Sequence, residues 1–469
     1  MKKTKIICSI GPASRNYETM KKMIESGMNV ARINFSHADE IEKSETIELV
    51  NRINSDINSS VAILFDTKGP DFRTGLLENN EIILEEGKEI KIVKEDVLGN
   101  IDRITVNYKE ALDDINVGNT ILLEDGLMKL SVIEKDEKGL TCKIINGGVL
   151  GNRKGVNVPG VELNVPFISE QDYNDIVYAC EHNGDYLALS FVDSKDDIIE
   201  AKKILKEHNG EGMQIISKVE SNTAIKNIDE IIEYSDGIMV ARGDLGVEVP
   251  MQQLPILQKM IIDKCRMQGK FCIVATEMLS SMQKNARPTR AEVSDIANAV
   301  LDGTDAVMLS GETTVGKYPI EAVKYMADIC ENTEMHIDYK NQTDCIKKPD
   351  ITATIARSVV DSANVLNAKV IAAATMSGYT ARKISTLRPE SIILAGCPTK
   401  KVALSLALNW GVYPTNVPIY NSTDEIVNDA LKKAKEFMPL KEKDIVIITG
   451  GFPNNTEVKA TNFLKIAEI

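Results

Sequence analysis

Paired cysteines, long apolar runs and an excess of positive charge are all missing from this sequence of 469 residues. Its eight cysteines are scattered and none forms a CxxC pair, so the sequence predicts neither a zinc site nor a disulfide framework. No apolar stretch approaches the length of a membrane span, and the apolar run at residues 6–10 is too short for a signal peptide. Reduced thiols and the missing targeting segments favour a cytoplasmic protein with no membrane association.

The net charge of −14 argues against sequence-independent binding to nucleic acids or to anionic membranes. Internal repeats and low-complexity tracts are missing as well. The composition, with 43% hydrophobic and 26% charged residues, is that of an ordinary globular protein. A chain of this length divides into two or three domains. If such an acidic protein handles anionic substrates, positive charge has to be concentrated locally by Lys, Arg or a bound metal.

The most informative stretch is residues 215–248, where two short apolar runs flank a segment with a helical pattern. The first run ends at Lys218 and Glu220, and the second ends at Gly243 and Asp244. This order predicts a strand, a crossover helix and a second parallel strand, and α/β sheets bind ligands at the carboxyl ends of such strands. Glu220 and Asp244 could then share a divalent cation such as Mg²⁺, with the charge of Lys218 beside them.

Two interpretations of this stretch stay open on local grounds. A lysine and two acids near strand ends form a solvated salt-bridge network about as often as they form a functional site. Gly243 and Gly246, on either side of Asp244, would let backbone amides approach a ligand closely, but they would serve equally well as turn residues. The rest of the chain has to decide between the two.

Apolar strands alternate with helical segments over residues 1–69 and again over residues 166–340. Eight strands are predicted, and an insertion follows the third. This number and order predict a (β/α)8 TIM barrel, in which the carboxyl ends of all strands meet at one mouth. The polar residues expected at this mouth are Arg32, Asn34, Ser36, Asp66, Thr67, Ser190, Lys218, Glu220, Asp244, Thr276 and Ser310.

The pattern changes between residues 70 and 165, where short alternating strands are separated by turn residues. We expect a small β-barrel domain there, inserted after the third barrel strand and placed over the mouth as a lid that excludes water. Arg73 lies near one crossing into this domain, and Arg153 and Lys154 lie near the other.

After a polar connector, residues 350–469 predict an open C-terminal α/β domain. One of its loops offers hydroxyls and backbone amides at a predicted helix N-terminus, which is a favourable place for an anion. Simple helix capping by Ser377 or Thr380 is the alternative, and composition alone favours it. The candidate anion-binding residues are Thr375, Ser377, Gly378, Tyr379 and Thr380.

Over essentially its whole length the sequence resembles the pyruvate kinase family. So many matches in the same order make a chance similarity negligible. The resemblance implies a glycolytic phosphotransferase that moves the phosphoryl group of phosphoenolpyruvate to ADP and gives pyruvate and ATP. The matching motifs are KTKIICSIGPAS from Lys3, GMNVARINFSH from Gly27, DTKGPDFRTG from Asp66, RKGVNVPG from Arg153, IISKVES from Ile215, DGIMVARGDLGVEVP from Asp236 and RPTRAEVSDIANAVLDGTDAVMLSGET from Arg287.

The resemblance implies roles for the residues at the mouth. Lys218 would stabilise the transferring phosphoryl group and the enolate, and Arg32 would hold the phosphate. Thr276 would lie beside the methylene carbon that is protonated after the transfer. Backbone amides at Gly243 and Asp244 would bind the carboxylate of the substrate.

Two metal sites are implied as well, one for Mg²⁺ (or Mn²⁺) at Glu220 and Asp244 and one for K⁺. A single carboxylate among neutral oxygens suits a monovalent ion better than a divalent one. Asp71 stands where potassium-dependent members carry a glutamate, which favours dependence on potassium. Without the resemblance, Asn34 and Ser36 would be assigned turn or capping roles. The implied K⁺ ligands are Asn34, Ser36, Asp66 and Thr67.

The nucleotide is expected near the lid crossings, and an effector is expected at the C-terminal loop. By resemblance the effector is fructose 1,6-bisphosphate, another sugar phosphate or AMP, and the assembly is a homotetramer. Trp410 is expected near a second effector phosphate, with core packing as an equal alternative. The implied nucleotide-binding residues are Asn34, His37, Arg73 and Lys154, of which His37 could equally be structural.

Three positions depart from the family pattern. Glu124 replaces one of a usual acidic pair, Glu277 stands where a glutamine is common, and Asp193 stands where an arginine is frequent.

Two other functions are weighed against this one. Another phosphoenolpyruvate or pyruvate barrel, such as an aldolase or a mutase, would not need a lid with Arg73 and Lys154. A non-catalytic sugar-phosphate sensor would be expected to have lost the barrel site.

Overall fold

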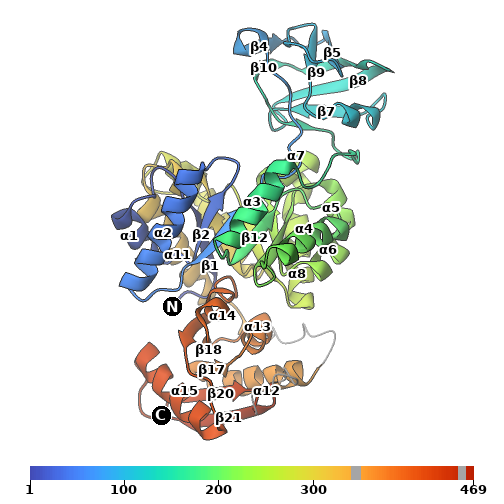
Figure 1. Ribbon diagram of the computed structural model, residues 1–469. Helices are drawn as coiled ribbons and strands as arrows, with labels where there is room; N and C mark the ends of the chain where they lie inside the picture. The colour runs from blue at the N-terminus through green and yellow to red at the C-terminus, as the bar shows by residue number, and fades with distance from the viewer. Residues whose placement is uncertain (340–349, 453–460) are drawn as a thin grey trace.

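The computed structural model of the chain describes residues 1–339, 350–452 and 461–469 (Figure 1). A closed barrel lies in the middle, an inserted group of strands lies at one end, and a C-terminal sheet lies at the other (Figure 1). The predicted fold class is confirmed, whereas the exact domain limits stay a prediction. The connector with Cys345 falls outside the described residues. Within the described parts, no helix is both long and apolar enough to cross a membrane.

The barrel consists of eight parallel strands, and the last strand pairs with the first to close it. The number of strands and the insertion after the third are those predicted from the sequence. The strands, in their order around the barrel, are β1 (Lys5–Ser9), β2 (Val30–Asn34), β3 (Ala62–Asp66), β12 (Tyr186–Leu189), β13 (Gln214–Val219), β14 (Gly237–Ala241), β15 (Phe271–Ala275) and β16 (Ala306–Leu309).

Helices cover the outside of the barrel, and two features of them differ from the expected pattern. The segment after β13 is two helices, because Asn227 between them leaves helical geometry. A short helix, α7, also begins directly after β14. The barrel helices are α1 (Tyr17–Glu25), α2 (Glu40–Asp56), α3 (Glu170–Glu181), α4 (Lys195–Glu207), α5 (Asn222–Lys226), α6 (Ile228–Tyr234), α7 (Arg242–Glu248), α8 (Leu254–Gln268), α9 (Arg290–Leu301), α10 (Gly311–Thr314) and α11 (Pro319–Glu334).

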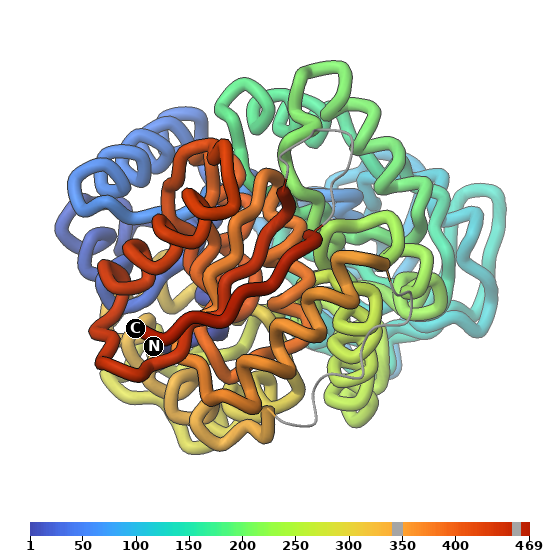
Figure 2. Tube along the Cα trace, turned by 90° about the horizontal axis from the view of Figure 1, so that it is seen from below, coloured from blue at the N-terminus to red at the C-terminus, as the bar shows by residue number. Residues whose placement is uncertain are grey.

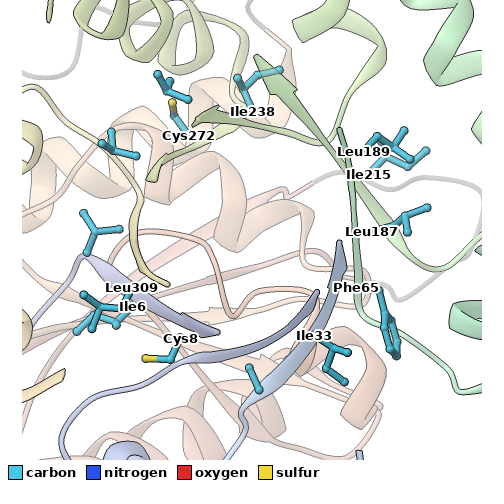
Figure 3. Packing of buried hydrophobic residues seen from close by; sticks show 14 of the residues in the cluster. Ile6, Cys8, Ile33, Phe65, Leu187, Leu189, Ile215, Ile238, Cys272 and Leu309 are labelled. Carbon is cyan, nitrogen blue, oxygen red and sulfur yellow. The ribbon is translucent and has the colours of Figure 1, made fainter. Parts of the chain in front are cut away.

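Side chains of each barrel strand alternate between two hydrophobic cores, as the pleat of a strand requires. Outward-facing residues such as Phe65 and Leu187 pack against the helices (Figure 3). Inward-facing residues fill the barrel interior, and Ala407 and Leu408 of the C-terminal region belong to this same inner core. The hydroxyl of Tyr186, at the start of β12, also bonds to the carbonyl of Leu404 at 3.1 Å. The C-terminal region therefore closes the amino end of the barrel and leaves the carboxyl end open.

A repeated side-chain contact links the amino ends of the barrel strands in pairs. The residue just before every second strand accepts a hydrogen bond from a backbone N–H of the strand before it. Three of the four acceptors are aspartates, so this rim carries negative charge toward the C-terminal region. The four bonds are Ile6 N–H to Asn29 (3.0 Å), Ile63 N–H to Asp185 (2.8 Å), Ile215 N–H to Asp236 (2.9 Å) and Cys272 N–H to Asp305 (3.0 Å).

The inserted strands form a six-stranded sheet in the order β11-β7-β8-β9-β5-β6 and a two-stranded sheet of β10 and β4. They enclose a core of their own, because every second residue of β4 and β5 is buried. The prediction of an inserted β region is thus confirmed. The strands are β4 (Glu81–Leu84), β5 (Glu89–Val93), β6 (Arg103–Thr105), β7 (Thr120–Leu123), β8 (Met128–Asp136), β9 (Gly139–Asn146), β10 (Gly148–Gly151) and β11 (Val156–Asn157).

The C-terminal region is an open five-stranded sheet in the order β19-β18-β17-β20-β21, with only β21 antiparallel (Figure 2). The open α/β sheet predicted for this region is confirmed. The elements are α12 (Ile351–Leu366), β17 (Val370–Ala374), α13 (Tyr379–Thr386), β18 (Ile392–Cys397), α14 (Lys400–Leu404), β19 (Val412–Asn416), α15 (Thr423–Phe437), β20 (Ile445–Gly450) and β21 (Phe463–Glu468).

Candidate active site

The carboxyl ends of neighbouring strands bring the predicted charged residues into contact at the open mouth of the barrel. Lys218 lies on β13, and its ammonium is 3.0 Å from the carboxylate of Glu220 and 3.3 Å from that of Asp66. The same Nζ donates to the hydroxyl of Ser190 at 2.7 Å. The side chain of Lys218 is only 12% exposed and those of both acids are 1% exposed. A solvated surface network, one of the two interpretations of this stretch, is therefore ruled out.

Two basic residues share Asp66, at the end of β3. Arg32, on the adjacent strand β2, pairs with Asp66 at 2.6 Å and donates to the hydroxyl of Ser9 at 2.7 Å. Burial opposes ionisation of Asp66, but the charges of Arg32 and Lys218 lower its pKa below the ordinary value. Burial likewise opposes the charge of Lys218, yet Asp66 and Glu220 raise the pKa of its ammonium. The mouth thus carries two fixed positive charges close together.

The second acidic group of the mouth is Glu220 with Asp244. Burial, together with the nearby charge of Asp244, raises the pKa of Glu220 to about 7, although the charge of Lys218 opposes the shift. One Glu220 oxygen accepts the N–H of Phe191 at 2.7 Å. Among the described residues, none forms a hydrogen bond or an ion pair with the carboxylate of Asp244. A buried carboxylate beside an unpaired one is a favourable place for a cation.

The donor set fits a hard divalent cation that keeps open coordination positions. The described residues contain no group of three or more His, Cys, Asp and Glu side chains arranged around a metal. Mg²⁺ is commonly bound by one or two carboxylates, with water and substrate oxygens completing its shell. Two carboxylates, Glu220 and Asp244, match that pattern and do not match a closed structural metal site.

Thr276 follows β15 with an unusual backbone conformation. Its φ is +69°, and that of Glu277 is +54°. This left-handed region is costly for a β-branched residue, and such residues concentrate at functional sites. The hydroxyl of Thr276 accepts the N–H of Gly243 at 2.8 Å, so the Gly243 amide has an internal partner here. The predicted residues of β14 and β15 therefore lie side by side.

The sequence analysis assigned no role to Arg242, which holds this corner together. Its guanidinium forms two bonds to Asp295 of α9, at 2.8 and 2.7 Å, and donates to the carbonyl of Thr276 at 2.7 Å. Arg242 is 8% exposed. The available signal was an arginine directly after a fully buried strand, but the partner Asp295 lies 53 positions away in sequence.

A cavity of about 630 Å³ lies between the barrel mouth and the inserted strands. All four predicted nucleotide-binding residues line it, namely Asn34, His37, Arg73 and Lys154, together with Asp244. The two lid crossings run side by side, since the N–H of Thr74 donates to the carbonyl of Lys154 at 2.9 Å. Arg73 pairs with Asp71, and Lys154 pairs with Glu124 at 2.6 Å. The departure at Glu124 thus places a carboxylate beside a predicted phosphate-binding lysine.

Comparison with known proteins agrees with this geometry. Residues 1–323 match the family model described as pyruvate kinase, barrel domain, and residues 353–467 match pyruvate kinase, alpha/beta domain. The chain belongs to the pyruvate kinase family. The pyruvate kinase of Bacillus licheniformis is 44% identical over 99% of this chain and 80% of its own length. That of Clostridium acetobutylicum is 43% identical over 99% of both chains.

A solved structure extends the comparison to the fold. The crystal structure of a pyruvate kinase from Cryptosporidium parvum matches with a TM-score of 0.95 and 38% identity, over 100% of this chain and 96% of the other. This pyruvate kinase family member is thus a phosphotransferase, and the prediction of function made from the sequence is confirmed. The aldolase or mutase interpretation and the sensor interpretation lose their support.

The residues predicted for potassium lie at the ends of β2 and β3, which pair so that Asn34 is opposite Asp66. The side-chain oxygen of Asn34 accepts the N–H of Ser36 at 3.1 Å, as in the turn role considered from the sequence. Thr67 is buried, and its hydroxyl accepts the N–H of Ser190 at 3.2 Å. The four residues therefore occupy one corner of the mouth of this pyruvate kinase fold.

In the C-terminal region, the predicted anion loop lies before α13. Thr375 and Thr380 are buried, whereas Ser377 and Tyr379 are exposed. The N-cap of α13 is Gly378, with φ of +82°, and no side chain caps the helix. The alternative in which Ser377 or Thr380 caps this helix is therefore wrong. The hydroxyl of Thr380 instead lies 2.7 Å from that of Thr461, beyond residues 453–460, which the structure does not describe.

Trp410 packs in the core, which is one of the two alternatives considered from the sequence. It is 2% exposed and packs at 6.0 Å, between ring centroids, from Tyr339. The guanidinium of Arg388 lies over its ring at 5.0 Å, and the ammonium of Lys3 lies 5.3 Å from the ring centroid. The residue thus fills the junction between the barrel and the C-terminal region.

Proposed function

We propose that Lys218, with Glu220 and Asp244, forms the centre at which this enzyme moves the phosphoryl group of phosphoenolpyruvate to ADP. The observation that carries the proposal is the buried ammonium of Lys218, 3.0 Å from Glu220 at the open mouth of the barrel. Phosphoryl transfer depends mainly on positioning and on stabilising negative charge. A charge held away from water is worth more than the same charge in solvent, because the local dielectric is low.

Each residue of the mouth has a separate task in this proposal. Lys218 stabilises the negative charge on the transferring phosphoryl group and on the enolate that leaves. Arg32, held in place by Asp66 and Ser9, binds the phosphate. Thr276 lies beside the methylene carbon that is protonated, and the amides of Gly243 and Asp244 hold the carboxylate. Binding of the substrate would then replace the internal bond from Gly243 to Thr276.

Glu220 and Asp244 would hold Mg²⁺ or Mn²⁺, and the ion would supply positive charge to the oxygens of the substrate. The unpaired carboxylate of Asp244 and the raised pKa of Glu220 both support this assignment. On the lid side of the cavity, Asn34, His37, Arg73 and Lys154 would bind the nucleotide. Arg73 and Lys154 come from the two crossings, so closure of the inserted region over the mouth would move both of them together.

Potassium is assigned to Asn34, Ser36, Asp66 and Thr67. With one carboxylate among neutral oxygens, these residues offer a site of low charge. Asp71, which pairs with Arg73 and lies 3.6 Å from Lys68, supplies an acid where potassium-independent members carry a lysine. Activity measured with potassium should exceed activity measured with sodium alone. Equal rates in the two buffers would refute the assignment.

An effector, either a sugar phosphate or AMP, is assigned to the loop of Thr375, Ser377, Gly378, Tyr379 and Thr380. Ser377 and Tyr379 are exposed in this loop, and no side chain caps the start of α13. A homotetramer located in the cytoplasm is the assembly that we expect. Light scattering on the purified protein tests the assembly, and pyruvate formation with and without each phosphate tests the effector.

The decisive experiment is a coupled assay for pyruvate with phosphoenolpyruvate, ADP and Mg²⁺. We expect pyruvate to form only when all three are present, because the proposed centre needs a phosphoryl acceptor and a cation. Omission of ADP separates this reaction from an aldolase or mutase reaction of the same substrate. Pyruvate release that proceeds unchanged without ADP would overturn the proposal.

A further inference from the structure

One buried carboxylate bonds to both of the chain segments that join the barrel to the inserted strands. The first crossing (residues 67–73) leaves the end of β3, and the second crossing (residues 153–169) returns to the start of α3. Asp172, in the first turn of α3, is 2% exposed and contacts each of them. The sequence analysis assigned no role to this residue.

Each oxygen of Asp172 serves one crossing. Oδ1 accepts the backbone N–H of Lys68 at 3.1 Å and that of Gly69 at 3.0 Å, both in the first crossing. Oδ2 accepts the N–H of Ser169 at 3.2 Å and its hydroxyl at 2.6 Å, at the end of the second crossing. Among the described residues, no basic side chain pairs with Asp172. Four neutral donors therefore hold the carboxylate, and hydrogen bonds to an ionised acceptor are roughly twice as strong as neutral ones.

Helix capping explains only half of this arrangement. Ser169 and Asp172 form the capping box of α3, and that motif uses Oδ2 alone. The bonds to Oδ1 come from residues 104 and 103 positions earlier in the chain. At α9 the corresponding acid, Glu292, also accepts four bonds, but all of them come from Ser281 and Thr289 in its own loop. The contact with the first crossing is thus additional to the cap.

The first crossing is tightly packed where it meets Asp172. Gly69 has a φ of +74°, and a Cβ there would lie 2.8 Å from the Cβ of Ser190, so a larger residue would not fit. The hydroxyl of Ser190 donates to the carbonyl of Thr67 at 2.7 Å and accepts a hydrogen bond from the ammonium of Lys218 at 2.7 Å. Asp172 therefore holds the first crossing against a residue that contacts Lys218.

We propose that Asp172 is a positioning residue for the nucleotide, because it fixes both crossings to one point at the edge of the barrel. Arg73 ends the first crossing, Lys154 lies near the start of the second, and both line the cavity at the mouth. The spacing of the crossings at Asp172 determines how the inserted strands turn toward the barrel and where the two cations meet a diphosphate. This inference rests on the proposed function, since it concerns the nucleotide of that reaction.

The anchor acts on the range of positions that the inserted strands can adopt. With both crossings bound to Asp172, few positions compete with the one that places Arg73 and Lys154 over the mouth. Release of one crossing adds other positions, and the apparent affinity for the nucleotide falls with the fraction of molecules in the competent position. Phosphoenolpyruvate is assigned to the barrel mouth, so its affinity depends much less on the crossings.

Assays for pyruvate on Asp172→Asn and on the control Glu292→Gln test the inference. The amide keeps one acceptor oxygen and turns an N–H toward the other crossing, so one crossing is released. We expect KM for ADP to rise about tenfold, as for the loss of one or two bonds to a charged group, and KM for phosphoenolpyruvate to stay within about twofold. Glu292→Gln removes the same charge from a matched cap outside the nucleotide cavity, so its KM for ADP should equal that of the wild type.

Hydrogen exchange gives a second measurement that needs no activity. Peptides covering residues 67–73 should exchange faster in Asp172→Asn than in the wild type, and at the wild-type rate in Glu292→Gln. Loss of the cap alone would loosen only the start of α3. If Asp172→Asn does not fold, Ser169→Ala removes a single hydroxyl donor to Oδ2, and KM for ADP should then rise about threefold.

Two results overturn the inference. One is a wild-type KM for ADP in a folded Asp172→Asn protein. The other is an equal rise of both KM values with unchanged exchange of residues 67–73, which would leave Asp172 with the role of a cap. A wild type that forms no pyruvate refutes the proposed function instead. In that case the exchange of residues 67–73 still decides the inference, because an unchanged rate in Asp172→Asn would show that this residue does not anchor the first crossing.

Discussion

At the scale of single residues, Lys218 is the group on which the chemistry depends. It is a buried cation between Asp66 and Glu220, and both acids raise the pKa of its ammonium. A residue that stays charged in a site with little water stabilises the negative charge that develops beside it during the reaction. Glu220 is in the opposite situation, because burial raises its pKa and favours its neutral form until a second cation arrives.

Replacement of Lys218 by methionine should remove the charge and keep most of the volume. We expect kcat in the pyruvate assay to fall by roughly 100- to 1,000-fold or more, because charge stabilisation in the transition state is lost. Affinity for phosphoenolpyruvate should change much less, since Arg32 still holds the phosphate. Circular dichroism should show a folded variant. A near-normal kcat would show that Lys218 does not have this role.

Asp193, where the family often has an arginine, gives a prediction about pH. Burial raises its pKa from 3.8 to about 6, and the charge of Asp197 adds to the shift, although Ser221 donates to the carboxylate. The folded protein therefore binds an extra proton between these values, and Asp193 lowers stability as pH rises through this window. Asp193→Asn should raise the free energy of unfolding by about 1 to 2 kcal/mol at pH 8.

Urea unfolding of the wild type and of Asp193→Asn at a series of pH values checks this prediction. The gain should narrow as pH falls from 6 toward 4, because Asp193 is then protonated in the folded state and begins to be protonated in the unfolded state as well. Glu86→Gln, at an exposed turn, is a control that removes one negative charge without removing a buried one. A gain that stays constant from pH 8 to pH 4 would contradict the assignment of the effect to Asp193 ionisation.

At the scale of elements, the amino-terminal rim of the barrel carries the junction with the C-terminal region. Aspartates before β12, β14 and β16 each fix the preceding strand through its backbone. Asp305 also pairs with Arg388 at 2.8 Å, and the two side chains are 6% and 4% exposed. One carboxylate thus ties two barrel strands and the end of α13 together, so strand order and domain docking depend on the same residue.

Arg388→Met should destabilise the protein strongly, because it leaves Asp305 buried without its cation. Removal of one partner of a buried ion pair costs about 3 to 5 kcal/mol. Lys264→Met is the control, since Lys264 pairs at 2.6 Å with the exposed Asp229, and such surface pairs contribute about 0 to 1 kcal/mol. Scanning calorimetry compares the two variants, and equal shifts in their melting temperatures would count against the junction role of Arg388.

At the scale of the whole molecule, the barrel faces a different partner at each end. The open mouth meets the inserted strands across a polar cavity, and the closed end is sealed by residues of the C-terminal region (Figure 1). Trp410, the only tryptophan of the chain, lies in that seal. A change in how the C-terminal region docks would alter the surroundings of this one indole.

The fluorescence of Trp410 should therefore report the junction. We expect blue-shifted emission from the native protein, because the residue is 2% exposed, and a red shift when urea opens the junction. Native emission typical of a water-exposed indole would contradict the buried position.

The strands and the residues at their ends were predictable because their signals are local. The apolar runs before Lys218 and Asp244, with a helical pattern between them, indicated parallel strands with charged carboxyl ends. The strands of the C-terminal region were harder to predict. The strand β19 contains a proline and lies at the edge of the sheet, and edge strands show only a weak alternation of apolar and polar residues. The position of Trp410, at an effector site or in the core, could not be predicted, because its sequence neighbours do not show which residues of this segment contact the barrel.

The sequence by itself determined the order of elements, the barrel with its insertion and the set of charged groups at the mouth, because periodicity and polarity act over a few residues. Only the tertiary structure decided which groups pair. It joined Lys218 to Ser190 and Asp66, and Arg242 to Asp295, and it gave Thr276 its left-handed backbone. These contacts depend on strand register and burial, which bring together residues too far apart in the chain for any local pattern to connect.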